Sequence, residues 1–142
     1  MIGKWRKKHK KWGSREPVPL IALFLPFLLW PVEWFLPYPA VVEELAKLGL
    51  VILVVKNAPV KVQLPMVIAS GVMFAASETL LYIVNAAQYG NLAVLGWRLI
   101  LTVPMHLATF IILYWGVKEK LWWAGLAIAI LVHWGFNFLA GR

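Results

Sequence analysis

Long apolar runs fill nearly all of the chain after residue 17. The hydrocarbon core of a bilayer is about 30 Å thick, so a helix that crosses it needs roughly 20 mostly apolar residues. Hydrophobic residues make up 62% of the 142 positions, which is more than a water-soluble fold of this size can bury. The sequence therefore predicts an integral, all-α membrane protein whose function lies within or beside the bilayer.

Short turns divide the apolar sequence into five predicted membrane spans. The spans cover about 17–37, 40–56, 62–86, 92–116 and 121–140. We expect a single transmembrane helical domain over residues 17–142, preceded by a basic arm over residues 1–16. Pro26 and Pro31 interrupt the first span, but in a membrane proline kinks a helix more often than it ends one. No small-residue cleavage site follows this span, which argues against a signal peptide.

Basic residues gather on one side of the predicted membrane. Seven of them lie before residue 17, namely Lys4, Arg6, Lys7, Lys8, Lys10, Lys11 and Arg15. The turns on the same side add Lys56, Lys61, Lys118 and Lys120. Only Arg142 lies on the other side, so the positive-inside rule predicts a cytoplasmic N-terminus. A basic arm next to an apolar segment indicates contact with anionic lipid rather than with nucleic acid.

Ionisable or amide side chains occur in four consecutive predicted spans. They include Glu43, Glu44 and Lys47, then Glu78, then Arg98 and His106, and finally His133 and Asn137, whereas Glu33 of the first span lies near the interface. Such groups are costly inside a bilayer, so each one indicates a functional site. At about 1.5 Å per residue, Glu78 lies about 10–12 Å below the outer surface and His106 about 20 Å below it. Most of the set thus falls in the outer half of the membrane, where one water-filled pocket could hold it.

Each of these residues also has a structural explanation. Lys47 lies four residues after Glu43 and three after Glu44, so either pair could simply neutralise charge and let the span insert. Arg98 could pair with the glutamate of the third span or reach outward to water. A lone histidine such as His106 could hydrogen-bond one helix to another.

Two polar groups share one face of the fifth span, because His133 and Asn137 lie one turn apart. Each of them needs a partner, which favours a functional explanation. Ser70 on the third span, together with His133, could suggest a serine protease. Ser70 is a small residue between apolar neighbours, however, and helix packing explains it better.

The polar residues follow four short motifs in sequence order. They are EExxK at 43–47, FxxxE at 74–78, a lone histidine at 106 and HxxxN at 133–137. This order resembles the PrsW family of intramembrane proteases, within the superfamily of CAAX-processing and bacteriocin-processing membrane endopeptidases. The CAAX branch usually has EExxxR and FxxxH, so Lys47 and Glu78 favour the PrsW branch. The resemblance covers about residues 40–140, and the chain would be a minimal-size member.

The resemblance implies an enzyme, an endopeptidase that cuts a membrane-associated protein near the extracytoplasmic face. The implied catalytic residues are Glu43, Glu44, Glu78, His106, His133 and Asn137, with Lys47 and Arg98 balancing their charge. Glu43 would be the general base, and the other two glutamates would complete the water or metal site. His133 and Asn137 would donate to the oxyanion, and His106 would orient the water or assist the base.

Zinc is the alternative to a metal-free mechanism, and its ligands would be Glu43, Glu78, His106 and His133. No HExxH pair is present to favour a metal. Three glutamates face two fixed cations in the expected pocket, and such a surplus is met by a proton or by a divalent cation. We expect protonation and no bound cofactor, because Lys47 lies one turn from Glu43 and would compete with a metal for it.

Two other functions fit the same residues. One is a non-catalytic scaffold or substrate-binding protein of the same fold, since the superfamily includes the scaffold subunit of gamma-secretase. The other is a small ion or metal transporter, although the sequence has no symmetric repeat. The expected partners are a membrane-protein or peptide substrate and anionic lipids at the basic arm, in a prokaryotic plasma membrane. The sequence leaves open whether the chain forms a homo-oligomer.

Overall fold

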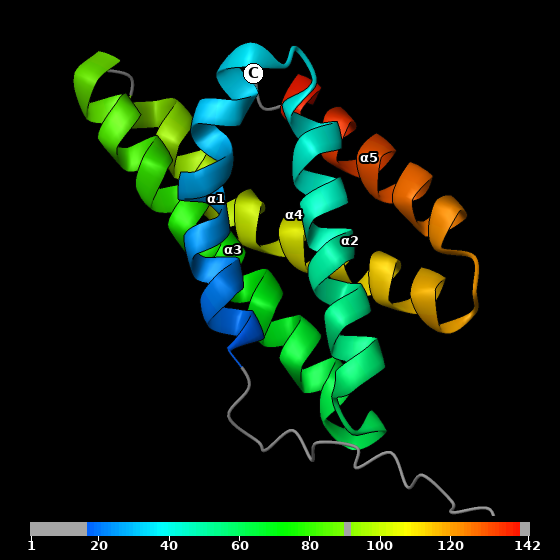
Figure 1. The fold of residues 1–142 in the computed structure, drawn as a ribbon. Coiled ribbons are helices and arrows are strands. Elements are labelled where there is room, and N and C mark those ends of the chain that lie inside the picture. The colour runs from blue at the N-terminus through cyan, green and yellow to red at the C-terminus, as the bar shows by residue number, and fades with distance from the viewer. Residues whose placement is uncertain (1–16, 90–91, 140–142) are drawn as a thin grey trace, which may run out of the picture.

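The computed structural model describes residues 17–89 and 92–139, with all their side chains except those of 85–89, 92–95 and 97–99. The elements in these ranges are all helices, which confirms the prediction of an all-α fold with five helices (Figure 1). The helices are α1 (Val18–Phe35), α2 (Pro39–Asn57), α3 (Val60–Tyr89), α4 (Leu92–Lys118) and α5 (Trp122–Leu139). The basic arm predicted over residues 1–16 lies outside the described residues.

Four of the five helices are long and apolar enough, by length and composition, to cross a membrane. Their apolar segments are Val18–Phe35, Val60–Val84, Ile100–Lys118 and Trp122–Leu139. The exception is α2, which carries Glu43, Glu44 and Lys47 in its first half. These properties are consistent with an integral membrane protein in which the other helices shield α2 from lipid.

The α2 helix lies at the centre of the arrangement. It contacts each of the other four helices, whereas, within the described residues, α1 contacts only α2 and α3, and α5 contacts only α2 and α4. In Figure 1, α1 and α3 lie on one side of α2, α5 lies on the other, and α4 crosses behind it. The most polar helix is therefore also the most enclosed one.

Large hydrophobic side chains cover the outward faces of the bundle. Exposed examples on α1 and α5 are Leu20, Phe24, Leu28, Leu131 and Trp134. Glu44, Lys47 and His106, by contrast, are completely buried. This distribution inverts the pattern of a water-soluble protein, in which charged residues are rarely buried, and it suits a protein surrounded by lipid.

Prolines lie inside α1 and at the start of α2. The α1 helix continues from Val18 to Phe35 although Pro26 and Pro31 lie inside it, which confirms that these prolines do not end it. Residues 36–38 connect it to α2, and Pro39 occupies the first turn of α2, where the missing N–H costs nothing. We call the end that holds residues 36–38 the linker end. The last turns of α5 also lie there (Figure 1).

A pair of glycines brings α4 and α5 close together. A Cβ atom added to Gly125 would lie 3.1 Å from the Cα of Gly116, so neither position has room for a side chain. Further along the same two helices, the rings of His106 and His133 meet edge to face, with centroids 5.4 Å apart. The two helices are thus in contact at the glycine pair and again at the two histidines.

Candidate active site

Polar side chains from four helices meet inside the bundle. We call this set the polar cluster, and its members are Glu43, Glu44 and Lys47 of α2, Glu78 of α3, His106 and Thr109 of α4, and His133 of α5. None of them is more than 6% exposed. The fold thus brings together residues that lie far apart in the sequence. Among the predicted site residues, Asn137 lies outside the polar cluster, and the side chain of Arg98 is not described.

The ammonium group of Lys47 lies at the centre of the polar cluster. Its Nζ donates to Glu44 Oε1 at 2.6 Å, to His106 Nδ1 at 2.7 Å and to Thr109 Oγ1 at 3.4 Å. A lysine ammonium has three donors, so all of them are used. The ring of Phe74 covers the group, with its centroid 4.7 Å from Nζ. Lys47 therefore joins α2 to α4 and has no contact left to gain from solvent.

Lys47 also determines which nitrogen of His106 carries a proton. Because Nδ1 accepts from the Lys47 ammonium, the proton of the neutral imidazole lies on Nε2. This Nε2–H group faces Glu78 and donates to its Oε2. Thr109 Oγ1 in turn donates to the main-chain carbonyl of His106 at 3.1 Å. The series Lys47, His106 and Glu78 thus ties α2, α4 and α3 together.

His133 is oriented by Glu44. Its Nδ1 donates to Glu44 Oε1 at 2.7 Å, so this one oxygen accepts from both Lys47 and His133. The other nitrogen, Nε2, lies 3.9 Å from Glu43 Oε2, which is too long for a direct hydrogen bond. This Nε2 atom of His133 is buried and has no hydrogen-bond partner among the described residues. A water molecule or a substrate oxygen placed between these two atoms would provide one.

The polar cluster holds more acids than fixed cations. Its carboxylates are Glu43, Glu44 and Glu78, and its permanent cation is Lys47. Arg98 lies on α4, but its side chain is outside the described set. His106 cannot take a second proton while its Nδ1 accepts from the lysine, whereas His133 has a nitrogen available. Since unpaired charge is costly in a buried site, a proton on His133 is the simplest way to reduce the surplus.

Three of the four predicted zinc ligands form a compact group. Donor atoms of Glu43, Glu78 and His106 lie within 4.8 Å of one another, and ligands of a tetrahedral zinc would lie about 3.3–3.6 Å apart. However, the Nε2 of His106 carries the proton that it donates to Glu78. Moving that proton to Nδ1 would direct it against the Lys47 ammonium. With these proton positions, His106 has no nitrogen lone pair left for a metal while Lys47 is charged.

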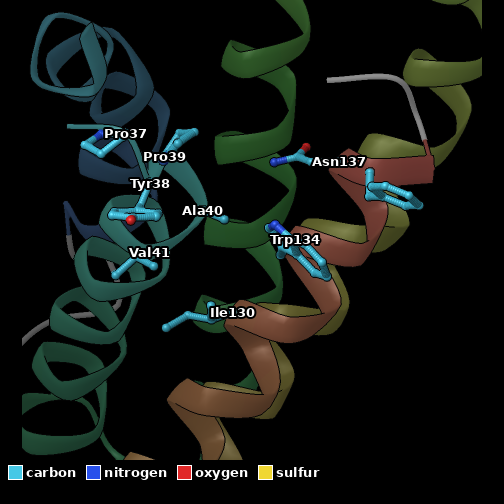
Figure 2. A pocket seen from close by; sticks show the side chains of 9 residues that line it. Pro37, Tyr38, Pro39, Ala40, Val41, Ile130, Trp134 and Asn137 are labelled. Atoms are coloured by element: carbon cyan, nitrogen blue, oxygen red, sulfur yellow. The ribbon is translucent and has the colours of Figure 1, made fainter. Parts of the chain in front are cut away.

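Asn137 does not join the polar cluster. It lies on α5 one turn beyond His133, is 8% exposed and makes no hydrogen bond within the described residues. Its side chain lines a cavity of about 380 Å³ at the linker end, between α2 and α5 (Figure 2). The shared face of His133 and Asn137 is thus directed inward, but the two residues meet different surroundings.

Some contacts could not be read from the motifs. Thr109 was not predicted, although its position three residues after His106 puts both on one face of α4. The cross-helix contact between Lys47 and His106 has no signal in the spacing of either motif. The Ser70 hydroxyl donates to the carbonyl of Met66 within its own helix, at 2.8 Å.

The polar cluster contains groups suited to proton transfer and to the stabilisation of negative charge. Glu43 can accept a proton, and Nε2 of His133, when protonated, can donate to an oxygen. Both groups are buried, so a charge that develops between them is poorly screened by solvent.

No protein-family model matches the chain, and no curated protein or solved structure matches it either.

Proposed function

We propose that the chain is an intramembrane endopeptidase that hydrolyses a peptide bond with water activated by Glu43. The proposal rests on the 3.9 Å separation between Glu43 Oε2 and His133 Nε2 within a cluster that is otherwise closely hydrogen-bonded. Peptide hydrolysis needs a base for the water and a donor for the oxyanion, and these two groups supply one each. The four motifs that resemble the PrsW family support the same chemistry.

In this mechanism Glu43 is ionised and His133 carries a proton on each ring nitrogen. A water molecule donates to Glu43, and the carbonyl oxygen of the scissile peptide accepts from Nε2–H of His133. Glu43 removes a proton from the water as the hydroxide attacks the carbonyl carbon, and the oxyanion forms beside the imidazolium. The proton on Glu43 then passes to the leaving nitrogen as the C–N bond breaks, which yields a carboxylic acid and an amine.

The rest of the polar cluster positions these two groups. Glu44 accepts from Nδ1 of His133 at 2.7 Å and would stabilise the imidazolium. Lys47 holds Glu44 in place from the other side. The hydrogen bond from His106 to Glu78 keeps a third carboxylate beside the site without a direct role in bond breaking.

We also propose that all five helices cross the membrane with the linker end extracytoplasmic. The basic residues at the end of α2 and in the turn after α4 lie away from the linker end, as the positive-inside rule requires of a cytoplasmic end. Enclosure of α2 by four helices would let it cross despite its charges. Glu43 and Glu44 belong to the second turn of α2, so the site would lie in the outer half of the bilayer.

The test is cleavage of a single-pass membrane protein by the purified protein in liposomes. The wild type should release a fragment, and Glu43→Gln should slow this by at least about 10²-fold, which is typical for loss of a general base. The matched control is Glu119→Gln, at an exposed position after α4, which should cleave at the wild-type rate. Failure of the wild type to cleave, or full activity of Glu43→Gln, would show that the proposal is wrong.

A non-catalytic scaffold is the second candidate. It is favoured by the three hydrogen bonds of Lys47, which would hold α2 against α4 in a bundle with no catalytic role. A scaffold would bind the same substrate and leave it intact, so the cleavage experiment separates the two functions.

A further inference from the structure

A cavity at the linker end separates the first turn of α2 from the last turns of α5. Its volume is about 380 Å³, within the range of small-ligand pockets. One wall is formed by residues 37–41, and the other by α5 residues that include Ile130, Trp134 and Asn137 (Figure 2). The cavity is thus bounded by the same two helices that carry Glu43 and His133.

The cavity lies one helical turn from the proposed site of bond cleavage. On α2, Ala40 lines the cavity and precedes Glu43 by one turn. On α5, Asn137 lines it and follows His133 by one turn. One turn of helix rises about 5.4 Å, and an extended peptide advances about 3.3 Å per residue. A peptide chain that runs from the gap between Glu43 and His133 would reach the cavity after about two residues.

The side chain of Asn137 lines this cavity and has no hydrogen-bond partner among the described residues. The residue is 92% buried, since 8% of its surface is exposed, and no described residue hydrogen-bonds to it. Figure 2 shows the amide extending from α5 into the space that separates α5 from the start of α2. An amide that lines a largely apolar cavity gains free energy when a ligand with a matching donor and acceptor binds there. An amide offers one acceptor and two donors, as needed to pair with both the C=O and the N–H of a peptide.

The lining of the cavity favours a peptide over a lipid. None of the described residues that line it carries a charge, so none of them offers a cation to an anionic headgroup. An acyl chain would fill the apolar space but would leave Asn137 unpaired. An extended peptide satisfies both features, because its main chain can pair with the amide and its side chain can occupy the apolar volume between Tyr38 and Trp134.

We propose that this cavity binds an extended segment of the substrate about two residues from the scissile bond, with Asn137 paired to its main chain and an apolar side chain inside. Asn137 is then a positioning residue rather than a donor to the oxyanion. The inference rests on the proposed function, because it places the segment relative to Glu43 and His133. It implies a substrate that is not helical at the cleavage site and that carries an apolar residue nearby.

Photo-crosslinking tests the position of the segment independently of cleavage. In the Glu43→Gln variant, p-benzoylphenylalanine replaces either Tyr38, in the cavity wall, or Trp123, which is exposed at the start of α5. A single-pass membrane substrate should crosslink at position 38 and not at position 123. Ile130→Trp should fill the cavity and remove the crosslink, whereas Leu131→Trp, on the exposed face of α5, should retain it.

Kinetics of an Asn137→Leu variant show whether the amide positions the substrate main chain or donates to the oxyanion. Loss of a main-chain hydrogen bond should raise KM about five- to tenfold and leave kcat within about twofold. A fall in kcat with unchanged KM would assign Asn137 to the oxyanion and overturn the inference. Crosslinks to lipid alone at position 38 would also overturn it.

The two proposals fail in different ways. If the wild type cleaves but position 38 gives no substrate crosslink, the peptide-binding cavity is wrong and the endopeptidase stands. If position 38 crosslinks to the substrate and the wild type never cleaves it, the cavity stands as a peptide-binding site. The catalytic mechanism at Glu43 is then wrong.

Discussion

Lys47 and His106 meet at 2.7 Å between Nζ and Nδ1, although 59 residues separate them in the chain. This contact assigns the proton of His106 to Nε2 and so makes the imidazole a donor to Glu78. It also excludes a second proton from His106 while the lysine is charged. The lysine of the EExxK motif thus sets the proton positions of a residue on another helix, in addition to pairing with Glu44.

Replacement of Lys47 by methionine should destabilise the protein strongly. The change leaves Glu44 and His106 buried without their shared donor, and removal of one partner of a buried ion pair typically costs about 3–5 kcal/mol. The free energy of unfolding in mixed micelles measures the effect. Lys56→Met, at an exposed position near the end of α2, is the control and should change stability by no more than about 0.5 kcal/mol. Equal stability of the two variants would contradict a central role for Lys47.

Chelators should leave the proteolytic rate unchanged, because both ring nitrogens of His106 are used, one to accept from Lys47 and the other to donate to Glu78. Equilibrium dialysis of the wild type should find no stoichiometric zinc. In Lys47→Gln the ammonium is gone, so a proton on Nδ1 of His106 is no longer opposed, and zinc should bind more tightly than to the wild type. Activity that is lost with a chelator and restored by one equivalent of zinc would overturn the metal-free mechanism.

The local part of the site could be predicted from the sequence. Glu44 and Lys47 lie three residues apart on one helix, and that spacing alone places them within reach of each other. The contacts between residues on different helices could not be predicted, because they depend on how the helices rotate and cross. The depths predicted for Glu78 and His106 differ by about 10 Å, whereas the two side chains are in contact. Depth along separate helices does not predict this contact, because α4 crosses the bundle at an angle (Figure 1).

The fifth helix shows the same limit of sequence patterns. The spacing of His133 and Asn137 predicts a shared face, and both residues are buried. Asn137 differs from His133 in its surroundings, because residues 37–41 form the wall of a cavity opposite Asn137. The HxxxN pattern contains no information about the α1–α2 connection, so it could not distinguish a member of the polar cluster from a residue in the cavity beside it.

Reporter fusions should establish the orientation of the chain. A reporter fused after Arg142 is expected outside the cytoplasm and one inserted at Lys118 inside it, because basic turns remain cytoplasmic. Alkaline phosphatase, which is active only outside the cytoplasm, and a fluorescent protein that folds inside it report opposite sides. The reverse pattern would contradict both the topology and the outward position of the site.

A methyl group at Gly125 should separate α4 from α5. The Cβ of Gly125→Ala would lie 3.1 Å from the Cα of Gly116 and 3.3 Å from the carbonyl oxygen of Ile112, and both are backbone atoms that cannot rotate away. We expect a loss of about 1–3 kcal/mol in the free energy of unfolding, as for other overpacked sites. We also expect slower cleavage, since the shift moves His133 relative to the α2 glutamates.

The matched control for Gly125 is Gly135 on the same helix. A Cβ atom there has no neighbour within 4 Å among the described residues, so Gly135→Ala should be neutral or should stabilise the helix by about 0.5–1 kcal/mol. Comparing the two alanine variants separates close packing from helix propensity, because both gain the same methyl group. If Gly125→Ala unfolds and cleaves like Gly135→Ala, the contact between α4 and α5 does not set the position of His133.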